Sequence, residues 1–170
     1  MIQKYTYGTP FETDAIVTSI PASEGTPAYG TISTENGFSF TYDMDDNDVV
    51  YGLGESNRGI NKRGYVYESN CSDQPNHTED KISLYGAHNF IVISGKQTFG
   101  LFVDYPGKLK FDIGYTLSSQ LKITCEDADL YLYVIEGETP YDIVKQFRKI
   151  IGRSYIPVSY THLTLPTILR

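Results

Sequence analysis

The stretch NGFSFTY, residues 36–42, decides the fold class. Its large side chains, Phe38, Phe40 and Tyr42, stand at every second position, which places them on one face of a β-strand. The Asn-Gly pair in front of them accepts the positive φ of a tight turn. We therefore expect this strand to pair with Thr31–Ser33 across a hairpin.

The same alternation recurs towards the C-terminus in short segments rich in Tyr, Phe, Val, Ile and Thr, separated by Gly, Asn, Asp or Pro. Each strand has an apolar face to bury, so nine strands in one layer would leave that face wet. The sequence predicts an all-β protein, a β-sandwich of two packed sheets. The seven further strands are expected at Val49–Leu53, Tyr65–Glu68, Asn89–Ser94, Phe99–Asp104, Leu109–Tyr115, Leu121–Glu126 and Leu130–Ile135.

One C-terminal segment has the period of an amphipathic helix instead. Thr139 is a suitable N-cap, Pro140 fits the first turn, Asp142 favours the positive end of the helix dipole, and Gly152 can end the helix. Periodicity alone leaves two interpretations: a helix that closes the sandwich, or a connector into a further domain. The apolar face comprises Ile143, Val144, Phe147, Ile150 and Ile151.

Composition excludes several classes of function. The 170 residues carry 14 Lys and Arg against 21 Asp and Glu, a net charge of −7, with no basic stretch, which argues against nucleic acid and against an anionic membrane surface as partners. No apolar run is long enough for a transmembrane helix, and residues 1–5 lack the apolar part of a secretory signal. Cys71 and Cys125 are expected to be free thiols. We expect a cytoplasmic protein.

The segment from Val158 to Arg170 departs from the pattern before it. It resembles a translated adapter of the kind used in sequencing-library preparation, so we expect residues 158–170 to be a non-native tail. A genuine C-terminal β-segment is the alternative.

No segment predicts a catalytic, metal or cofactor site. The acidic run 43–48 has oxygen ligands at alternate positions, but it lacks the Gly and Glu that a calcium loop needs, so a solvated hairpin turn is expected. The glycines of residues 52–59 are followed by no helix that would bind a phosphate, and we interpret them as tight turns. His77 lies near Glu79 and Asp80 but in a polar segment typical of a surface loop.

That segment, residues 69–80, is almost wholly polar and lies beside tyrosines. Its amides, hydroxyls and carboxylates suit hydrogen bonding to sugar hydroxyls, although the same composition also makes an idle loop.

Four motifs in register resemble a known family. They are residues 51–55 (YGLGE), the loop around 72–75 (SDQP), residues 99–104 (FGLFVD), and residues 138–144 (ETPYDIV) with Gly152-Arg153 and Pro157. Together they are similar to the N-terminal domain of bacterial α-glucosidases of glycoside hydrolase family 31. The resemblance is strong from Tyr51 to Pro157, weaker before it and absent after it.

The resemblance implies a galactose-mutarotase-like β-sandwich, residues 1–138, and a helix and connector, residues 139–157, leading to a missing (β/α)8 barrel that carries both catalytic carboxylates. It implies that Asp73 binds an α-glucoside oligosaccharide, while the YGLGE motif is structural. Relatives often place Trp-Asn before the Ser/Thr-Asp pair where this chain has Asn70-Cys71, so a stacking partner is lost. Both catalytic carboxylates belong to the missing barrel. This chain alone is therefore predicted to be inactive and to need no cofactor.

Two alternatives remain. One is a self-standing carbohydrate-binding β-sandwich. The other is an aldose mutarotase, which would need a His and a Glu facing each other and for which His88 is the candidate.

Overall fold

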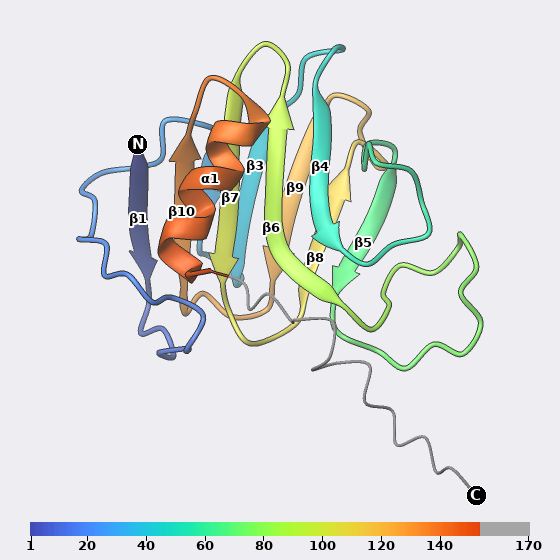
Figure 1. Cartoon of the computed structure of the whole chain (residues 1–170), viewed down its shortest axis with the longest axis horizontal. Helices are drawn as coiled ribbons and strands as arrows, with labels where there is room; N and C mark the ends of the chain where they lie inside the picture. The colour runs from blue at the N-terminus through green and yellow to red at the C-terminus, as the bar shows by residue number, and fades with distance from the viewer. Residues whose placement is uncertain (154–170) are drawn as a thin grey trace, which may run out of the picture.

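The computed structural model describes residues 1–153, which form two five-stranded antiparallel sheets and one helix (Figure 1). Sheet A has the order β1-β10-β7-β6-β4, and sheet B has the order β2-β3-β9-β8-β5. The elements are β1 (Ile2–Tyr7), β2 (Thr31–Ser33), β3 (Phe38–Asp43), β4 (Val49–Gly54), β5 (Tyr65–Ser69), β6 (Ala87–Ser94), β7 (Thr98–Asp104), β8 (Leu109–Ile113), β9 (Gln120–Cys125), β10 (Leu130–Glu136) and α1 (Pro140–Ile151).

All nine strands expected from the sequence are present, and β2 pairs with β3 as predicted, with Ile32 opposite Phe40. Gly37 has the positive φ of the expected turn, 78°. The tenth strand, β1, was not predicted. Among the strands of residues 1–153 it pairs with β10 alone, so it is an edge strand; it mixes polar with apolar residues, and Tyr5 is its one buried residue. Its alternation is correspondingly weak.

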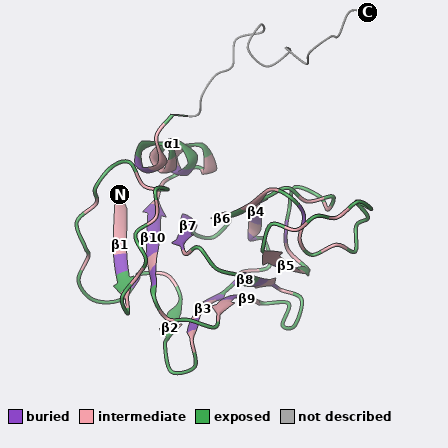
Figure 2. Ribbon diagram, turned by 90° about the horizontal axis from the view of Figure 1, so that it is seen from below, coloured by how far each residue is buried: buried purple, intermediate pink, exposed green. Residues whose placement is uncertain are grey.

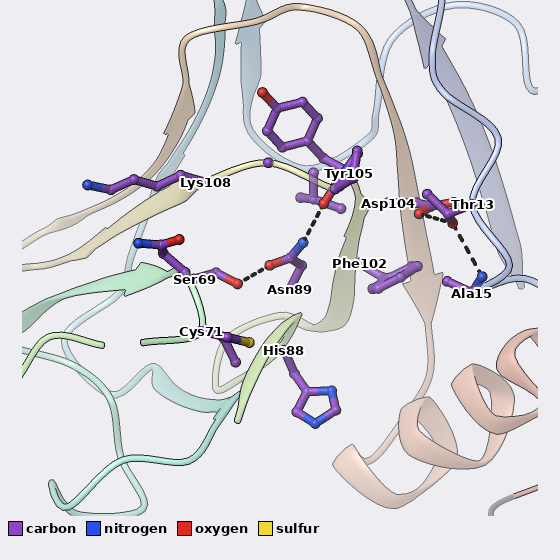
Figure 3. A pocket seen from close by; sticks show the side chains of 15 residues that line it. Thr13, Ala15, Ser69, Cys71, His88, Asn89, Phe102, Asp104, Tyr105 and Lys108 are labelled. Atoms are coloured by element: carbon purple, nitrogen blue, oxygen red, sulfur yellow. Dashed lines mark hydrogen bonds between the residues drawn. The ribbon is translucent and has the colours of Figure 1, made fainter. Parts of the chain in front are cut away.

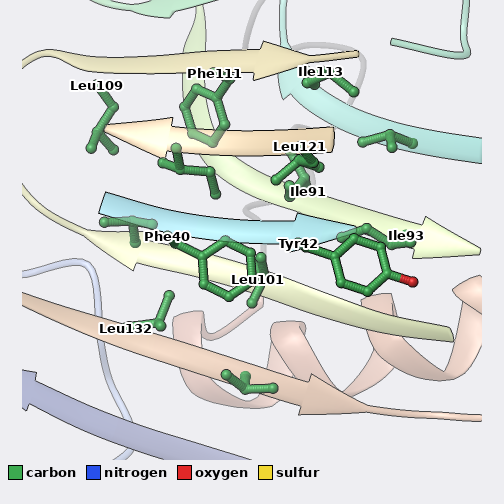
Figure 4. Packing of buried hydrophobic residues seen from close by; sticks show 14 of the residues in the cluster. Phe40, Tyr42, Ile91, Ile93, Leu101, Leu109, Phe111, Ile113, Leu121 and Leu132 are labelled. Carbon is green, nitrogen blue, oxygen red and sulfur yellow. The ribbon is translucent and has the colours of Figure 1, made fainter. Parts of the chain in front are cut away.

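The space between the sheets is filled by the alternating apolar side chains (Figure 4). Phe40 from β3, Leu101 from β7 and Phe111 from β8 are completely buried in this core. The neighbouring positions of sheet B point outward and are polar, as the period of two requires. The two-sheet β-sandwich is confirmed.

Sheet A is buried on its other face as well, because α1 lies across it on the side away from sheet B (Figure 2). Ile143 and Ile150 are completely buried there, and the ring of Phe147 stacks on Phe90 with centroids 3.8 Å apart and planes at 6°. Gly100 permits this approach, since a Cβ built on it would lie 2.5 Å from Cγ2 of Ile143. Most of the apolar face of the helix therefore packs on the sandwich, whereas Val144, which was predicted to belong to that face, is exposed.

The predicted helix ends are also confirmed. Thr139 is the N-cap, and its hydroxyl accepts a hydrogen bond from the Asp142 amide at 3.2 Å while the Asp142 carboxylate accepts from the Thr139 amide at 3.2 Å. This capping box satisfies amides that the first helical turn leaves unpaired. Gly152 ends the helix with φ 82°. Residues 158–170, the expected tail, lie outside the described residues.

The acidic run 43–48 is only partly the solvated hairpin turn that was expected: Asp46 and Asn47 are exposed, but the strands that the run joins, β3 and β4, lie in different sheets. Asp48 is buried, and its carboxylate accepts hydrogen bonds from the Tyr42 hydroxyl at 3.0 Å and from the amides of Asp45 at 2.9 Å and Lys96 at 3.0 Å. The guanidinium of Arg63 donates to the carbonyl oxygens of residues 45, 46 and 48. The sequence of the acidic run does not show that one of its carboxylates is buried and accepts the hydrogen bonds that hold the turn.

Candidate functional site

The polar segment belongs to a long loop, residues 70–86, that joins β5 of sheet B to β6 of sheet A and extends from one end of the sandwich (green, at the right of Figure 1). Its two arms are paired. The Ser72 amide donates to the Leu84 carbonyl at 3.0 Å, and the Ser83 hydroxyl donates to the Asn70 carbonyl. At the base, the Glu68 amide of β5 donates to the Ile82 carbonyl at 2.8 Å. The loop thus has a defined path.

The YGLGE motif fixes the far end of this loop. Leu53 has φ 69°, a left-handed conformation, and it lies between Gly52 and Gly54 at an irregularity in the β4–β6 register. The turn brings Glu55 to Gly86: the Glu55 amide donates to the Gly86 carbonyl at 2.6 Å, and the Gly86 amide donates to Oε2 of Glu55 at 3.0 Å. The motif serves the architecture of the loop, and no helix N-terminus follows it.

Arg58, which sequence reasoning did not single out, fastens the middle of the loop. Its guanidinium donates to the carbonyl oxygens of Val66 at 2.9 Å and Glu79 at 2.7 Å. The same group lies 4.4 Å from the ring centroid of Tyr65, within the range of a cation–π contact. One cation therefore connects β5 to the middle of the loop.

Asp73 lies exposed on the first arm, where one of its carboxylate oxygens, Oδ1, accepts a hydrogen bond from the Tyr85 hydroxyl. This bond to a carboxylate is the main reason that the pKa of Tyr85 is raised. The ring of His77 meets the ring of Tyr85 at 66°, with centroids 5.6 Å apart. The Asp80 carboxylate accepts a hydrogen bond from the Thr78 hydroxyl, so the ring of His77 contacts Tyr85 and not this carboxylate. Tyr85 was missed because twelve residues separate it from Asp73.

Beside the base of the loop is an open cleft of about 610 Å³ between the ends of β5, β6 and β7 (Figure 3). Asn89 of β6 spans it: its side-chain oxygen accepts from the Ser69 hydroxyl, and its amide donates to the Tyr105 carbonyl at 3.1 Å. On the other wall, the Thr13 hydroxyl donates to the buried carboxylate of Asp104 at 2.6 Å. Burial raises the pKa of Asp104.

Asp73 is not among the residues that line this cleft, whereas Cys71 and His88 are. His88 lies in β6 with an exposed side chain, and within residues 1–153 that side chain forms no hydrogen bond with a carboxylate.

The described residues offer little for thiol or metal chemistry. Both cysteines are free, and burial raises the pKa of the Cys125 thiol to about 11, which favours the protonated form at neutral pH. Residues 1–153 contain no cluster of three or more His, Cys, Asp or Glu side chains able to hold a metal ion. No helix in the same part of the chain is long and apolar enough to cross a membrane.

Comparison with known proteins supports one fold family. Residues 9–112 match the family model of the glycosyl hydrolase 31 N-terminal galactose mutarotase-like domain. The chain is 29% identical to alpha-glucosidase 2 of Bacillus thermoamyloliquefaciens over 133 residues, which are 72% of this chain and 17% of that protein. It is 23% identical to an alpha-xylosidase of Emericella nidulans, covering 71% of this chain and 15% of that protein.

Among solved structures, the chain resembles a GH31 dextranase of Flavobacterium johnsoniae, complexed with isomaltotriose, with a TM-score of 0.68 and 23% identity over 74% of this chain and 15% of that one. A cycloalternan-degrading enzyme of Trueperella pyogenes in complex with isomaltose gives a TM-score of 0.61 at 17% identity, over 89% of this chain and 23% of that one. The chain therefore spans about a sixth of the length of the curated relatives it matches.

Proposed function

Since this chain belongs to the N-terminal galactose mutarotase-like domains of glycosyl hydrolase family 31, we propose that it is the N-terminal β-sandwich of an α-glucosidase and that its loop 70–86 helps to bind an α-glucoside oligosaccharide. The observation that carries the proposal is the exposed carboxylate of Asp73 on a loop whose two arms, base and middle are each hydrogen-bonded. A polar loop without a binding role would not need to be held in one conformation by these hydrogen bonds.

Asp73 is the residue that we propose to touch the sugar. Its Oδ1 is engaged by Tyr85, and Oδ2 accepts no hydrogen bond within the described part of the chain. A carboxylate oxygen that faces solvent can accept hydrogen bonds from sugar hydroxyls, and such charge-assisted bonds are stronger than neutral ones. The loop would present this oxygen to a substrate held mainly by another domain.

We further propose that bond cleavage belongs to a barrel domain reached through residues 139–157, and that the 170-residue chain alone does not hydrolyse glycosides. A retaining mechanism needs two carboxyl groups about 5–5.5 Å apart on either side of the scissile bond, shielded from water. An exposed loop at the end of a sandwich offers no such enclosure. Release of glucose from an α-glucoside by the purified chain, above a matched blank, would contradict this part of the proposal.

The self-standing carbohydrate-binding module is the alternative that one observation favours. Ile143 and Ile150 of α1 are completely buried on sheet A, so most of the apolar face of the helix is covered without a further domain. A gene that continues past the codon for Pro157 into a barrel would decide for the α-glucosidase. For either protein we propose a cytoplasmic location, which suits the exposed, free thiol of Cys71.

The test of the loop uses the enzyme encoded by such a longer gene. Asp73→Ala is expected to raise KM for maltotriose while leaving the free energy of unfolding within about ±0.5 kcal/mol, as is usual for exposed positions. Glu79→Ala, an exposed carboxylate of the same loop, is the matched control and should leave KM unchanged. Equal kinetics of Asp73→Ala and wild type would remove the binding role.

A further inference from the structure

The loop places an exposed aromatic ring directly against Asp73. Tyr85 stands on the second arm, is 48% exposed, and donates its hydroxyl hydrogen to Oδ1 of Asp73. The two residues meet because the preceding residues of both arms are paired, the Ser72 amide to the Leu84 carbonyl. On the other side of Tyr85, Gly86 is fixed to Glu55 by two hydrogen bonds. Tyr85 is therefore held at both neighbours while its ring faces solvent.

A second ring supports the first. His77 meets Tyr85 edge to face, and the His77 carbonyl accepts a hydrogen bond from the Asn57 side-chain amide at 2.5 Å. Asn57 lies outside the loop, in the segment after β4, so the orientation of the aromatic pair is set from the body of the sandwich. The carboxylate and the two rings thus form one built surface.

This combination has the chemistry of a sugar platform. Tyr offers a large, rigid contact area with an apolar face and a polar tip at little cost in conformational entropy. The C–H face of a pyranose suits the ring, and its hydroxyls suit the carboxylate. The chain contains no Trp, and Asn70-Cys71 occupy the positions before the Ser-Asp pair. An aromatic partner for a sugar at Asp73 must therefore come from elsewhere.

We propose that Tyr85 is the specificity-determining residue of this loop: a pyranose stacks on its ring while donating hydroxyl hydrogens to Oδ2 of Asp73. The inference rests on the proposed function of the loop and adds to it the residue that supplies the stacking surface. Because the Tyr85 hydroxyl occupies Oδ1, only one carboxylate oxygen faces the sugar, so the ring and the carboxylate together fix its orientation.

The experiment titrates the purified 170-residue chain with maltotriose and follows the backbone amide shifts of residues 70–86 by NMR. The wild-type chain is expected to bind in the millimolar range, which a few contacts can provide. Tyr85→Ala should weaken binding about tenfold, whereas Tyr85→Phe, which keeps the ring, should weaken it less than about threefold. Tyr115→Ala, an exposed tyrosine of the β8–β9 turn, is the control and should bind as wild type does.

The outcomes separate the two proposals. Absence of any maltotriose-dependent shift in the wild-type chain overturns this inference, whereas the proposed function fails only if Asp73→Ala leaves KM unchanged in the longer enzyme. Binding that is weakened by Asp73→Ala but equal in Tyr85→Ala and wild type overturns the role of Tyr85 alone. Equal losses in Tyr85→Phe and Tyr85→Ala would assign Tyr85 to positioning Asp73 through its hydroxyl and would likewise refute stacking. Circular dichroism of each variant verifies that the sandwich is folded.

Discussion

Asp48→Ala, which truncates this buried side chain to a methyl group, is expected to destabilise the sandwich by about 3 kcal/mol. The carboxylate accepts three hydrogen bonds, from the Tyr42 hydroxyl and from the amides of Asp45 and Lys96. The two amides are only partly buried and regain water in the variant, which costs about 0.5 kcal/mol each. The Tyr42 hydroxyl, on a residue only 7% exposed, is left without a partner, at a cost of about 2 kcal/mol.

Urea denaturation followed by circular dichroism measures this loss. With a slope of about 2 kcal/mol per molar urea, a loss of 3 kcal/mol lowers the midpoint by about 1.5 M. Asp46→Ala removes an exposed carboxylate from the same turn and should stay within about 0.5 kcal/mol of wild type. Asp48→Asn, which keeps an acceptor oxygen, should fall between the two. If Asp48→Ala and Asp46→Ala unfolded at the same urea concentration, the structural role assigned to Asp48 would be wrong.

Three further predictions concern the buried groups around the sheets. Burial raises the pKa of Asp104, so the fold favours its neutral form. The stability gained from protonated Asp104 is present at pH 3 and is lost as the pH rises through the folded-state pKa. Asp104→Asn should therefore raise Tm at pH 7 but not at pH 3, and an equal gain at both would contradict the assignment. Gly100→Ala places a Cβ 2.5 Å from Cγ2 of Ile143 and should cost about 1–3 kcal/mol in urea unfolding, partly relieved by adding Ile143→Ala; strictly additive losses would exclude a clash. Iodoacetamide should alkylate Cys71 in the native chain much faster than Cys125, as peptide mass spectrometry would report; equal rates for the two thiols would contradict the raised pKa of Cys125.

The period of hydrophobicity was sufficient to place strands and the helix, because each of these elements has one face that must be buried. Phe38, Phe40 and Tyr42 reveal β3 by themselves, and the capping residues mark the start of α1 at Thr139. The strand β1 was missed because an edge strand is partly solvated and its alternation is diluted. Which strand lies beside which was mostly invisible, since pairings such as that of Ile2 with Ile135 join residues far apart in the sequence.

The site was predictable only in part for the same reason. The polar composition of residues 69–80 indicated a surface loop, and the family resemblance pointed to Asp73. Neither revealed Tyr85 or Arg58, because their relation to the loop depends on how its arms pair. Composition also described Asp48 wrongly, since the letters of an acidic run do not show which carboxylate turns inward. The polar composition of a segment can be read from the sequence, whereas contacts between the two arms of a loop are seen only in the folded structure.

The pairing of the first strand with the last has a consequence for synthesis on the ribosome. Among the strands of the described residues, β1 pairs with β10 alone, whose first residue is Leu130, so sheet A stays incomplete until almost the whole domain has emerged. At about 5–20 residues per second, β1 waits for roughly 6–25 s while the intervening chain is translated. During that interval its free edge, and the apolar face that α1 later covers, are open to chaperones and to neighbouring nascent chains. Covering the edge of β1 during translation should therefore raise the yield of folded sandwich.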